Sequence, residues 1–372
     1  MKWALAAFIL LHGLLHTMGF AKAFGIAQLD ALKVPIGRAA GVAWLLAGLL
    51  LVAATVLISI GPRSPGLAVA LSVVGLVAAL VSQAVIVTSW SDAKFGTLPN
   101  VVLLVFAGCV FAAFGPVGLR AEYRERSEGL LARTRPGEVL TEASVASLPA
   151  PLRRYLEVSG AVGRPVPASF RARWRGRIRS AADADWMALE AEQLNATTPA
   201  ERLFFMEATM MGLPAIGLHA YVGDNASMDV RALGLVQVAE GHGAAMTRAE
   251  TVTLFNDLAV LAPGALTAMP IAWTELAPNR LRGEFTNAGH TIAAELVFGE
   301  DGMLQDFVSN DRGRDVEGRF VVTRWSTPLS SPRDFGGLRI QSRGEARWAT
   351  AGEESFAYIE LTLLELTHDP VP

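Results

Sequence analysis

The first third of the chain is divided by a few charged residues into four long uncharged stretches. These stretches are residues 3–21, 39–62, 64–91 and 95–119. They hold 19, 24, 28 and 25 residues. A helix needs about 20 apolar residues to cross the hydrocarbon core of a bilayer, and only helices satisfy their own backbone there. The pattern therefore predicts a transmembrane domain over 1–119, with helices near 3–22, 39–60, 66–88 and 98–118.

The first stretch has a second interpretation, because Lys2 precedes it and Ala21-Lys22-Ala23 resembles the cleavage site of a secretory signal peptide. The length of the stretch favours an uncleaved helix. Four helices place both ends of this domain on one side, with five nearby basic residues against four on the other side. By the positive-inside rule this places the following domain on the cytoplasmic side of the membrane. The periplasmic or extracellular side is the alternative.

Alternation with a period of two begins near residue 170. Phe170, Ala172 and Trp174 alternate with the arginines of 171–177, which predicts a strand with one apolar and one cationic face. We expect further strands at 186–192, 202–211, 216–222, 226–231, 271–275, 281–286, 291–298, 303–308, 318–325, 337–348 and 355–366.

One segment between these strands is helical. Thr247 and Glu250 have the spacing of a capping box, and apolar residues follow at helical spacing as far as Pro263. A run of strands, one helix and a second run of strands predicts an α+β, mainly antiparallel β domain over 142–372. We expect a curved sheet or half-barrel of about eleven strands with one covering helix, joined to the membrane domain by a juxtamembrane stalk over 120–141.

Composition and charge divide the chain in the same way. Overall it is 52% hydrophobic and 18% charged, with a mean hydropathy of +0.36. Residues 1–120 carry seven basic and two acidic groups, whereas the remainder carries 25 basic and 33 acidic groups. The acidic second half argues against nucleic acid as a partner, and a single cysteine excludes a disulfide scaffold. The lipid bilayer is the first partner that the sequence predicts.

Two histidines in the first apolar stretch are candidates for function. His12 and His16 are four residues apart and so share one helix face. They are the residues that a metal, a haem or a proton relay would use, and hydrogen bonds between helices are the alternative. No other metal-ligating set accompanies them, so we expect no metal and no cofactor. The polar loop 89–100 adds Asp92 and Lys94, which can pair with each other or serve as interfacial anchors.

Charged groups of the second half have two interpretations as well. The arginines of 171–177 either bind anionic lipid headgroups or pair with Glu190 and Glu192 on the next strand. Asp311 and Asp315 are expected to pair with Arg312 or Arg314 at the surface. Neither a nucleophile elbow nor a phosphate-binding loop is present, and the histidines of this half have no metal-ligand spacing. We therefore expect that the protein is not an enzyme.

Several segments resemble a family of uncharacterised bacterial four-helix membrane proteins. They are residues 12–25, 89–100, 148–155, 344–348 and the helix around Glu250 with Pro263 and Leu266. The resemblance implies a C-terminal half-barrel like that of periplasmic lipoprotein carriers. The chain departs from the family pattern at Leu254, Phe255 and Ala259, where other members carry Tyr and Trp. No activity comes with this resemblance.

A half-barrel leaves a concave apolar face that one helix covers only in part, and such a face suits acyl chains. Soft or aromatic side chains at seven positions would line it. They are Phe204, Phe205, Met206, Met210, Met211, Trp273 and Trp325. The hypothesis is therefore a membrane protein whose second domain binds a lipid or another apolar small molecule. The alternatives are a closed core built from the same residues, and an interaction or sensory module for a membrane-protein partner.

Overall fold

The computed structural model describes residues 2–210, 213–316, 319–349 and 355–371. The chain forms two compact units. The helical unit comprises Met1–Glu122 with Leu233–Leu235, and the β unit comprises Tyr123–Ala232 with Val236–Pro372. This is the predicted fold class, in which long apolar helices precede a large antiparallel sheet.

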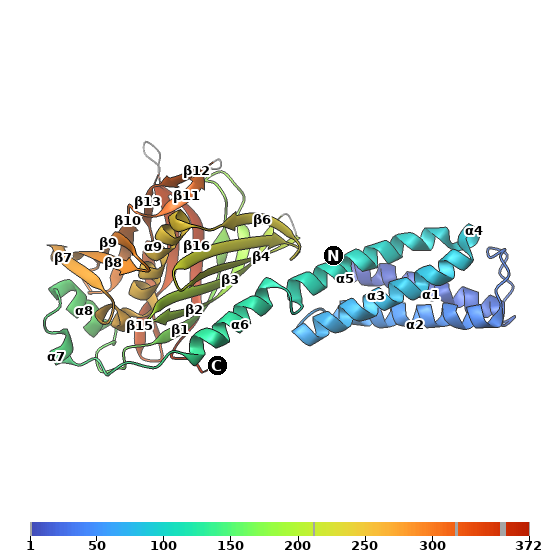
Figure 1. Ribbon diagram of the computed structural model, residues 1–372, viewed down its shortest axis with the longest axis horizontal. Coiled ribbons are helices and arrows are strands. Elements are labelled where there is room, and N and C mark those ends of the chain that lie inside the picture. Colours follow the sequence, from blue (N-terminus) through green and yellow to red (C-terminus); the bar gives the residue numbers. More distant parts are fainter. Residues whose placement is uncertain (1, 211–212, 317–318, 350–354, 372) are drawn as a thin grey trace. The chain divides into compact units, whose positions relative to one another are not determined.

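The helical unit contains four long helices, which lie side by side in Figure 1. They are α1 (Lys2–Ala23), α2 (Arg38–Ile60), α3 (Pro65–Thr88) and α5 (Thr97–Phe114). The short helix α4 (Trp90–Ala93) and a 3₁₀ turn, Lys94–Gly96, connect α3 to α5. Among the described residues, four helical segments are long and apolar enough to cross a membrane. The four predicted apolar helices are thereby confirmed as helices of sufficient length and composition.

Small residues let α1 and α2 pack closely. A Cβ added to Gly48 would lie 2.9 Å from the carbonyl oxygen of Gly13, and one added to Gly19 would lie 2.3 Å from the Trp44 ring. Such close approach is typical of helices that associate within a bilayer, where apolar burial between helices gains little. These glycines therefore set the spacing of the first two helices.

The β unit is dominated by one antiparallel sheet of 14 strands that does not close into a barrel. The strand order is β6-β5-β4-β3-β2-β1-β16-β15-β13-β10-β9-β8-β7, with β14 paired to β15 outside this path. The first run is β1 (Ser169–Ile178), β2 (Met187–Thr197), β3 (Ala200–Met210), β4 (Leu213–Val222), β5 (Asn225–Ala232) and β6 (Val236–Gly241). The second run is β7 (Ile271–Ala277), β8 (Arg280–Asn287), β9 (His290–Phe298), β10 (Leu304–Ser309), β13 (Arg324–Ser326), β14 (Leu329–Phe335), β15 (Leu338–Ala349) and β16 (Phe356–His368).

The first and last strands of the unit join these two runs, because β1 pairs with both β2 and β16. A separate two-stranded sheet consists of β11 (Gly313–Val316) and β12 (Arg319–Val322). The sheet has more strands than the expected eleven. Strand β6 carries mainly exposed side chains and so lacks an alternating pattern, and the largely exposed strand β14 contains Pro332, which ordinarily argues against a strand.

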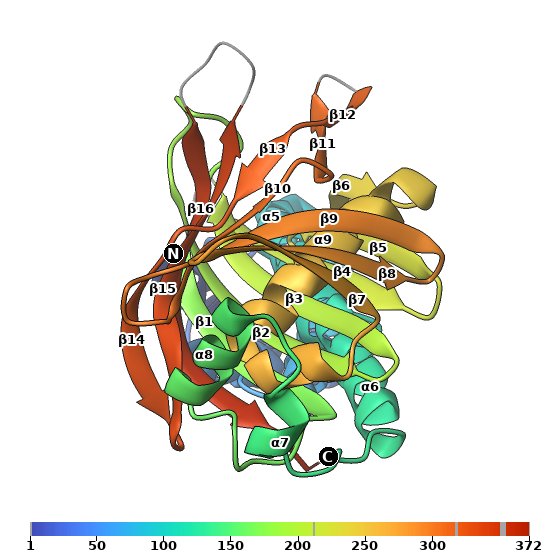
Figure 2. The same cartoon turned by 90° about the vertical axis from the view of Figure 1, so that its left-hand side faces the viewer.

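The sheet curves around the helix α9 (Ala244–Leu261), as Figure 2 shows. Thirteen residues of α9 are buried, on all sides of the helix. Because α9 is buried on all sides, it forms the centre of the core rather than a lid over it. Phe255 shows this best, because its ring is fully buried and lies 5.3 Å from the centroids of both Phe285 and Phe307.

The predicted capping box of α9 is wrong. The helix begins one turn earlier, after Gly243, whose φ of +88° suits glycine. Thr247 instead donates its hydroxyl to the carbonyl of Gly243 and accepts from the backbone N–H of Ala226. Glu250 turns inward to bind arginines, as described below. The tertiary partners of Thr247 and Glu250 therefore override the local motif.

The β unit includes part of the expected stalk. Helix α6 (Leu119–Ala132) is followed by a segment in which the Gly137 N–H donates to Val166 and the Leu140 N–H donates to Arg164. Leu140 is itself buried in the main core. Two further helices, α7 (Glu142–Val145) and α8 (Ala150–Val158), then lead into β1, and a 3₁₀ turn (Pro263–Thr267) follows α9.

We predict that residues 136–372 fold without the helical unit, since these residues hold the whole 14-stranded sheet and its core. The purified fragment should give a β-type circular dichroism spectrum and one cooperative thermal transition. A fragment that begins at Glu142 loses the Leu140 contacts and should melt at a lower temperature. A spectrum dominated by helix or random coil for the longer fragment would contradict this domain boundary.

Candidate functional site

The inner face of the sheet and helix α9 line a cavity of about 170 Å³. Its walls come from β1, β2, β3, β4, α9, β13, β14, β15 and β16. Much of the lining is apolar, and the largest such side chains are Trp174, Ile178, Phe204, Met206, Trp325, Leu329, Ile359 and Leu361. The expected concave apolar face therefore exists as a space inside the β unit.

A larger cavity of about 640 Å³ lies against the first one. The two share part of their walls, namely Ile178, Met206, His219, Glu250, Arg312 and Tyr358. Five methionines line the larger cavity: Met187, Met206, Met210, Met228 and Met246. Thioether side chains adapt to irregular shapes, so this lining fits a flexible apolar chain better than one rigid ring system.

Alternation along β3 sorts the predicted lining residues into two groups. Phe204, Met206 and Met210 line the cavities. Phe205 points to the other face of the strand, where its ring lies 5.6 Å from that of Tyr123 and is 1% exposed. Met211 lies outside the described residues.

Of the two tryptophans predicted to line the cavity, only one does so. Trp325 lines the smaller cavity, and its indole N–H donates to the hydroxyl of Tyr358 at 3.2 Å. Trp273 packs instead against the core, with its ring 6.0 Å from that of Phe255. Strand β7, which carries Trp273, is the edge strand of the sheet and supplies no residue to either cavity.

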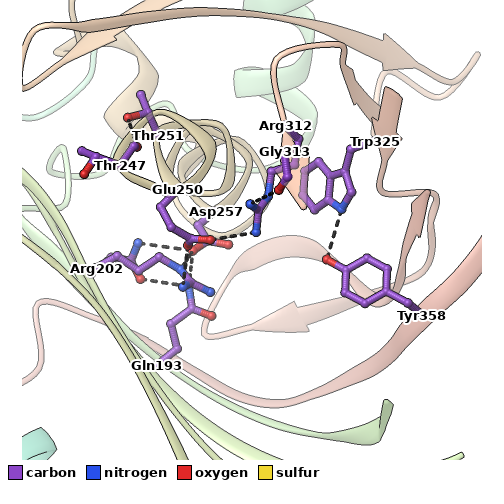
Figure 3. A network of polar contacts seen from close by, with 11 residues as sticks. Gln193, Arg202, Thr247, Glu250, Thr251, Asp257, Arg312, Gly313, Trp325 and Tyr358 are labelled. Carbon is purple, nitrogen blue, oxygen red and sulfur yellow. Dashed lines mark hydrogen bonds and ion pairs between the residues drawn. The ribbon is translucent and has the colours of Figure 1, made fainter. Parts of the chain in front are cut away.

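Four charged side chains, two of them from α9, meet in the wall of the smaller cavity (Figure 3). Arg202 donates to Asp257 at 2.7 Å and to Glu250 at 3.3 Å. Arg312 donates to the second oxygen of Glu250 at 2.7 Å. Each of the four side chains is at most 11% exposed. We call Arg202, Glu250, Asp257 and Arg312 the buried ion cluster.

Amide groups complete the coordination of Asp257. Gln193 donates to Asp257 at 2.6 Å, and Asn195 donates to it at 3.5 Å. The carbonyl oxygen of Gln193 in turn accepts from the indole N–H of Trp174 at 3.0 Å. Because a buried charge is tolerable only when it is paired and hydrogen-bonded, these contacts explain how the ions persist next to an apolar space.

The ion cluster shifts the pKa of its members in different directions. Burial acts to raise the pKa of Glu250, but the two arginines outweigh burial and hold that pKa below its ordinary value. Burial dominates at Asp257 and raises its pKa despite Arg202. Burial also lowers the pKa of the neighbouring His219 to about 4. With His219 neutral, two cations and two anions balance to zero net charge.

Three polar atoms in the lining of the smaller cavity are buried without a hydrogen-bond partner in the part of the chain that the structure describes. They are the hydroxyl of Thr253, the Nε–H of Arg312 and the side-chain carbonyl oxygen of Gln341. Buried polar groups are ordinarily paired, and each unpaired one is unfavourable. The residues that line the smaller cavity therefore include one unpaired donor, one unpaired acceptor and one unpaired hydroxyl, each covered by neighbouring atoms.

The prediction that Arg312 forms a surface ion pair with Asp311 or Asp315 is wrong. Arg312 belongs to the ion cluster, and Asp311 pairs instead with Arg248 at 2.7 Å. The side chain of Asp315 lies outside what the structure describes. Arg312 immediately precedes strand β11, and its guanidinium lies 5.8 Å from the ring centroids of both Trp325 and Trp348. The sequence gives no periodic signal for this position.

The arginines of β1 pair with carboxylates on both neighbouring strands. Arg175 lies 3.4 Å from Glu190 of β2, as expected from the ladder. Arg173 and Arg177 instead reach β16, where each lies 2.8 Å from its partner, Glu365 and Glu360 respectively. These contacts agree with the second interpretation of these arginines, in which they pair with carboxylates on a neighbouring strand instead of binding lipid headgroups. The partners on β16 could not be foreseen, since β1 and β16 are the most distant strands in the sequence.

The two histidines of the helical unit make a polar cluster between helices. The Nε2 atom of His12 lies 3.1 Å from both the Ser82 hydroxyl and the Asn100 side-chain oxygen. His16 lies 2.9 Å from the same Ser82 hydroxyl through Nε2, and its Nδ1 lies 3.0 Å from the His12 carbonyl oxygen. Asn100 donates to Gln83 at 3.0 Å. The cluster thus links α1, α3 and α5.

Asp92 and Lys94 have separate environments. The Asp92 carboxylate accepts the backbone N–H groups of Lys33 at 2.5 Å and Val34 at 2.7 Å. The ammonium of Lys94 lies 5.5 Å from the centroid of the Phe95 ring. Asp92 therefore joins the loop after α1 to the short helix α4. Within the residues covered by the structure, no group of three or more His, Cys, Asp or Glu side chains is arranged to hold a metal ion.

The buried His219 should make the free energy of unfolding depend on pH. Its ordinary pKa is 6.5 and its pKa in the folded protein is about 4. Between these values the unfolded state binds a proton that the folded state does not, so stability falls as the pH falls. We expect His219→Gln to remove up to about 3 kcal/mol of this loss between pH 6.5 and pH 4. Urea titrations of both proteins at pH 7.5 and pH 4.5 measure the difference, and equal losses in both would refute it.

Comparison with known proteins gives a family and similar folds. The sequence model of one family, described as "Family of unknown function (DUF6544)", matches residues 138–361. None of the curated proteins matches the chain. A LolA superfamily protein from Nitrosomonas europaea has 12% sequence identity and a TM-score of 0.33, over 59% of this chain and 94% of that chain. A DUF1329 family protein from Desulfovibrio piger has 10% identity and a TM-score of 0.34, over 62% and 94% respectively.

Proposed function

Because the chain belongs to the family of unknown function DUF6544, we propose a function from its geometry: a membrane-tethered protein whose β unit binds a lipid or another apolar small molecule. The observation that carries the proposal is the pair of adjoining cavities inside the sheet, one of about 170 Å³ and one of about 640 Å³. A closed core, the alternative in the sequence, would fill this space with side chains. Packed interiors contain few voids larger than a water molecule, so cavities of this size are suited to a ligand.

The lining supports a flexible chain as the ligand. Methionines from β2, β3, β5 and α9 surround the larger cavity, and aromatic rings surround the smaller one. Burying a methylene group gains roughly 0.8 kcal/mol, so eight to ten methylenes would give several kcal/mol to offset the cost of ordering the chain. A membrane is the natural reservoir for such a molecule, and the four apolar helices would hold the β unit beside it.

Location is part of this proposal. The helices would cross the cytoplasmic membrane of a bacterium, with both ends of the helical unit on the cytoplasmic side by the count of basic residues. A cysteine introduced after the helices at an exposed position, for example Glu128→Cys in the Cys109→Ser background, and one introduced in the 23–37 loop would report opposite sides. Labelling by a membrane-impermeant maleimide in intact cells measures this, and labelling of Glu128→Cys would reverse the orientation.

We predict that Met210→Asp abolishes binding of an uncharged fluorescent probe such as N-phenyl-1-naphthylamine, or weakens it at least tenfold. The reason is that Met210 lines the larger cavity, where a carboxylate would be desolvated or would draw in water. Fluorescence titration of the purified full-length protein measures the affinity. The matched control is Thr209→Asp, on the exposed opposite face of the same strand, which should bind as the wild type does. Equal binding by both variants would refute the cavity as the ligand site.

A further inference from the structure

The ion cluster and the unpartnered polar atoms lie at the same place, in the wall of the smaller cavity. A purely apolar ligand would leave these polar atoms unpaired and would need no ions beside it. The larger cavity has the softer and more apolar lining, with its five methionines. An amphiphile would therefore place its chain in the larger cavity and its head in the smaller one, against Thr253, Arg312 and Gln341.

The charge of that head follows from the balance of the cluster. Both oxygens of Glu250 are taken by arginines, and Asp257 is held by Arg202 with Gln193 and Asn195. The positive and negative groups are equal in number, and burial keeps His219 neutral near pH 7. A charged head beside the cluster would then be an unbalanced ion next to charges that are at most 11% exposed, which is unfavourable.

Resting on the proposed function, we infer that the β unit selects amphiphiles with an uncharged hydrogen-bonding head, such as a long-chain alcohol or a monoacylglycerol, over fatty acids, phospholipids and cationic amphiphiles. A hydroxyl head matches these groups in kind, because a hydroxyl can accept from an N–H such as the Arg312 Nε–H and donate to an oxygen such as that of Gln341 once the side chains turn toward it. The Thr253 hydroxyl can take either role toward it.

Three probes with the same ten-carbon chain test the selection at pH 8: 1-decanol, decanoate and decylammonium. Displacement of N-phenyl-1-naphthylamine from the full-length protein gives each affinity. We expect decanol to bind at least tenfold more tightly than either ion. Preferred binding of decanoate or decylammonium would overturn the inference. Failure of all three probes, and of the fluorescent reporter itself, would instead overturn the proposed function.

Charge variants separate true selection from the greater water solubility of ions. Glu250→Gln gives the site a net positive charge, and it should improve decanoate relative to decanol at least tenfold. Arg312→Gln gives a net negative charge and should improve decylammonium by a similar factor. If affinity followed solubility alone, the ratios would be the same in all variants, and the inference would be refuted.

A milder pair of variants covers the case in which a charge variant does not fold. Thr253→Val and Gln341→Leu keep side-chain size while they remove a hydrogen-bonding group. Each should weaken decanol relative to the fluorescent reporter about fivefold to tenfold, in line with the loss of one hydrogen bond. Unchanged decanol binding in both variants would refute contact between the head and these side chains.

Discussion

Arg202→Met is expected to lower the free energy of unfolding of the β unit by about 3–5 kcal/mol, which is the usual range when one partner of a buried ion pair is removed. Arg202 is 8% exposed and donates to two carboxylates, Glu250 and Asp257. Without it, Asp257 keeps only neutral amide donors, and Glu250 keeps only Arg312. Urea denaturation followed by tryptophan fluorescence measures the loss.

The control for this prediction is Arg173→Met on the neighbouring strand β1. Arg173 also forms an ion pair, at 2.8 Å from Glu365, but the two side chains are 50% and 62% exposed. Solvent screens such a pair, so its removal should change the free energy of unfolding by less than about 1 kcal/mol. Equal effects of the two substitutions would mean that burial of the ion cluster does not determine its contribution.

The second large effect is expected at Phe255, at the centre of α9. Phe255→Ala should lower the free energy of unfolding by about 3–5 kcal/mol, because it deletes a fully buried ring and leaves a cavity. The ring touches aromatic residues of β7, β8 and β10, namely Trp273, Phe285 and Phe307. The helix therefore loses contacts with the second run of strands.

Phe255→Leu is the graded comparison for this position. It retains most of the volume and should lower the free energy of unfolding by less than about 2 kcal/mol. Thermal denaturation of the two variants in parallel gives the ratio. If both substitutions had the same small effect, α9 would be a replaceable cover over the sheet and not the centre of its core.

The fold could be predicted from the sequence where local pattern and final environment agree. The four uncharged stretches became four long helices, and the alternation at 170–177 became β1, because each pattern reflects which side of an element meets an apolar surrounding. Strand β6 was not predicted, because its side chains are mostly exposed and show no two-residue period. Thr247 and Glu250 were misassigned to a cap because their real partners come from distant segments.

The residues of the candidate site were likewise predictable only where a local pattern in the sequence indicated them. A rich run of aromatic and methionine residues at 204–210 indicated an apolar face, but only the alternation of β3 in the folded sheet separates Phe204 and Met206 from Phe205. Met228 and Met246 line the same cavity from β5 and α9, and single methionines give no signal in a sequence. The ion cluster was missed for a deeper reason: Arg202, Glu250 and Arg312 are far apart in the chain, and each resembles a surface residue until the sheet brings them together.

The polar cluster of the helical unit determines where each of its protons lies. The His12 carbonyl can only accept, so His16 carries its proton on Nδ1. Its Nε2 must then accept the Ser82 hydroxyl proton, and Ser82 in turn accepts the proton on Nε2 of His12, which also faces the Asn100 oxygen. Rotation of α3 by one residue would replace Ser82 with Val81 or Gln83 and break this chain of donors and acceptors. The same few hydrogen bonds thus select one rotational setting of α1, α3 and α5, a choice that apolar faces alone would leave nearly degenerate if the helices lie within a bilayer.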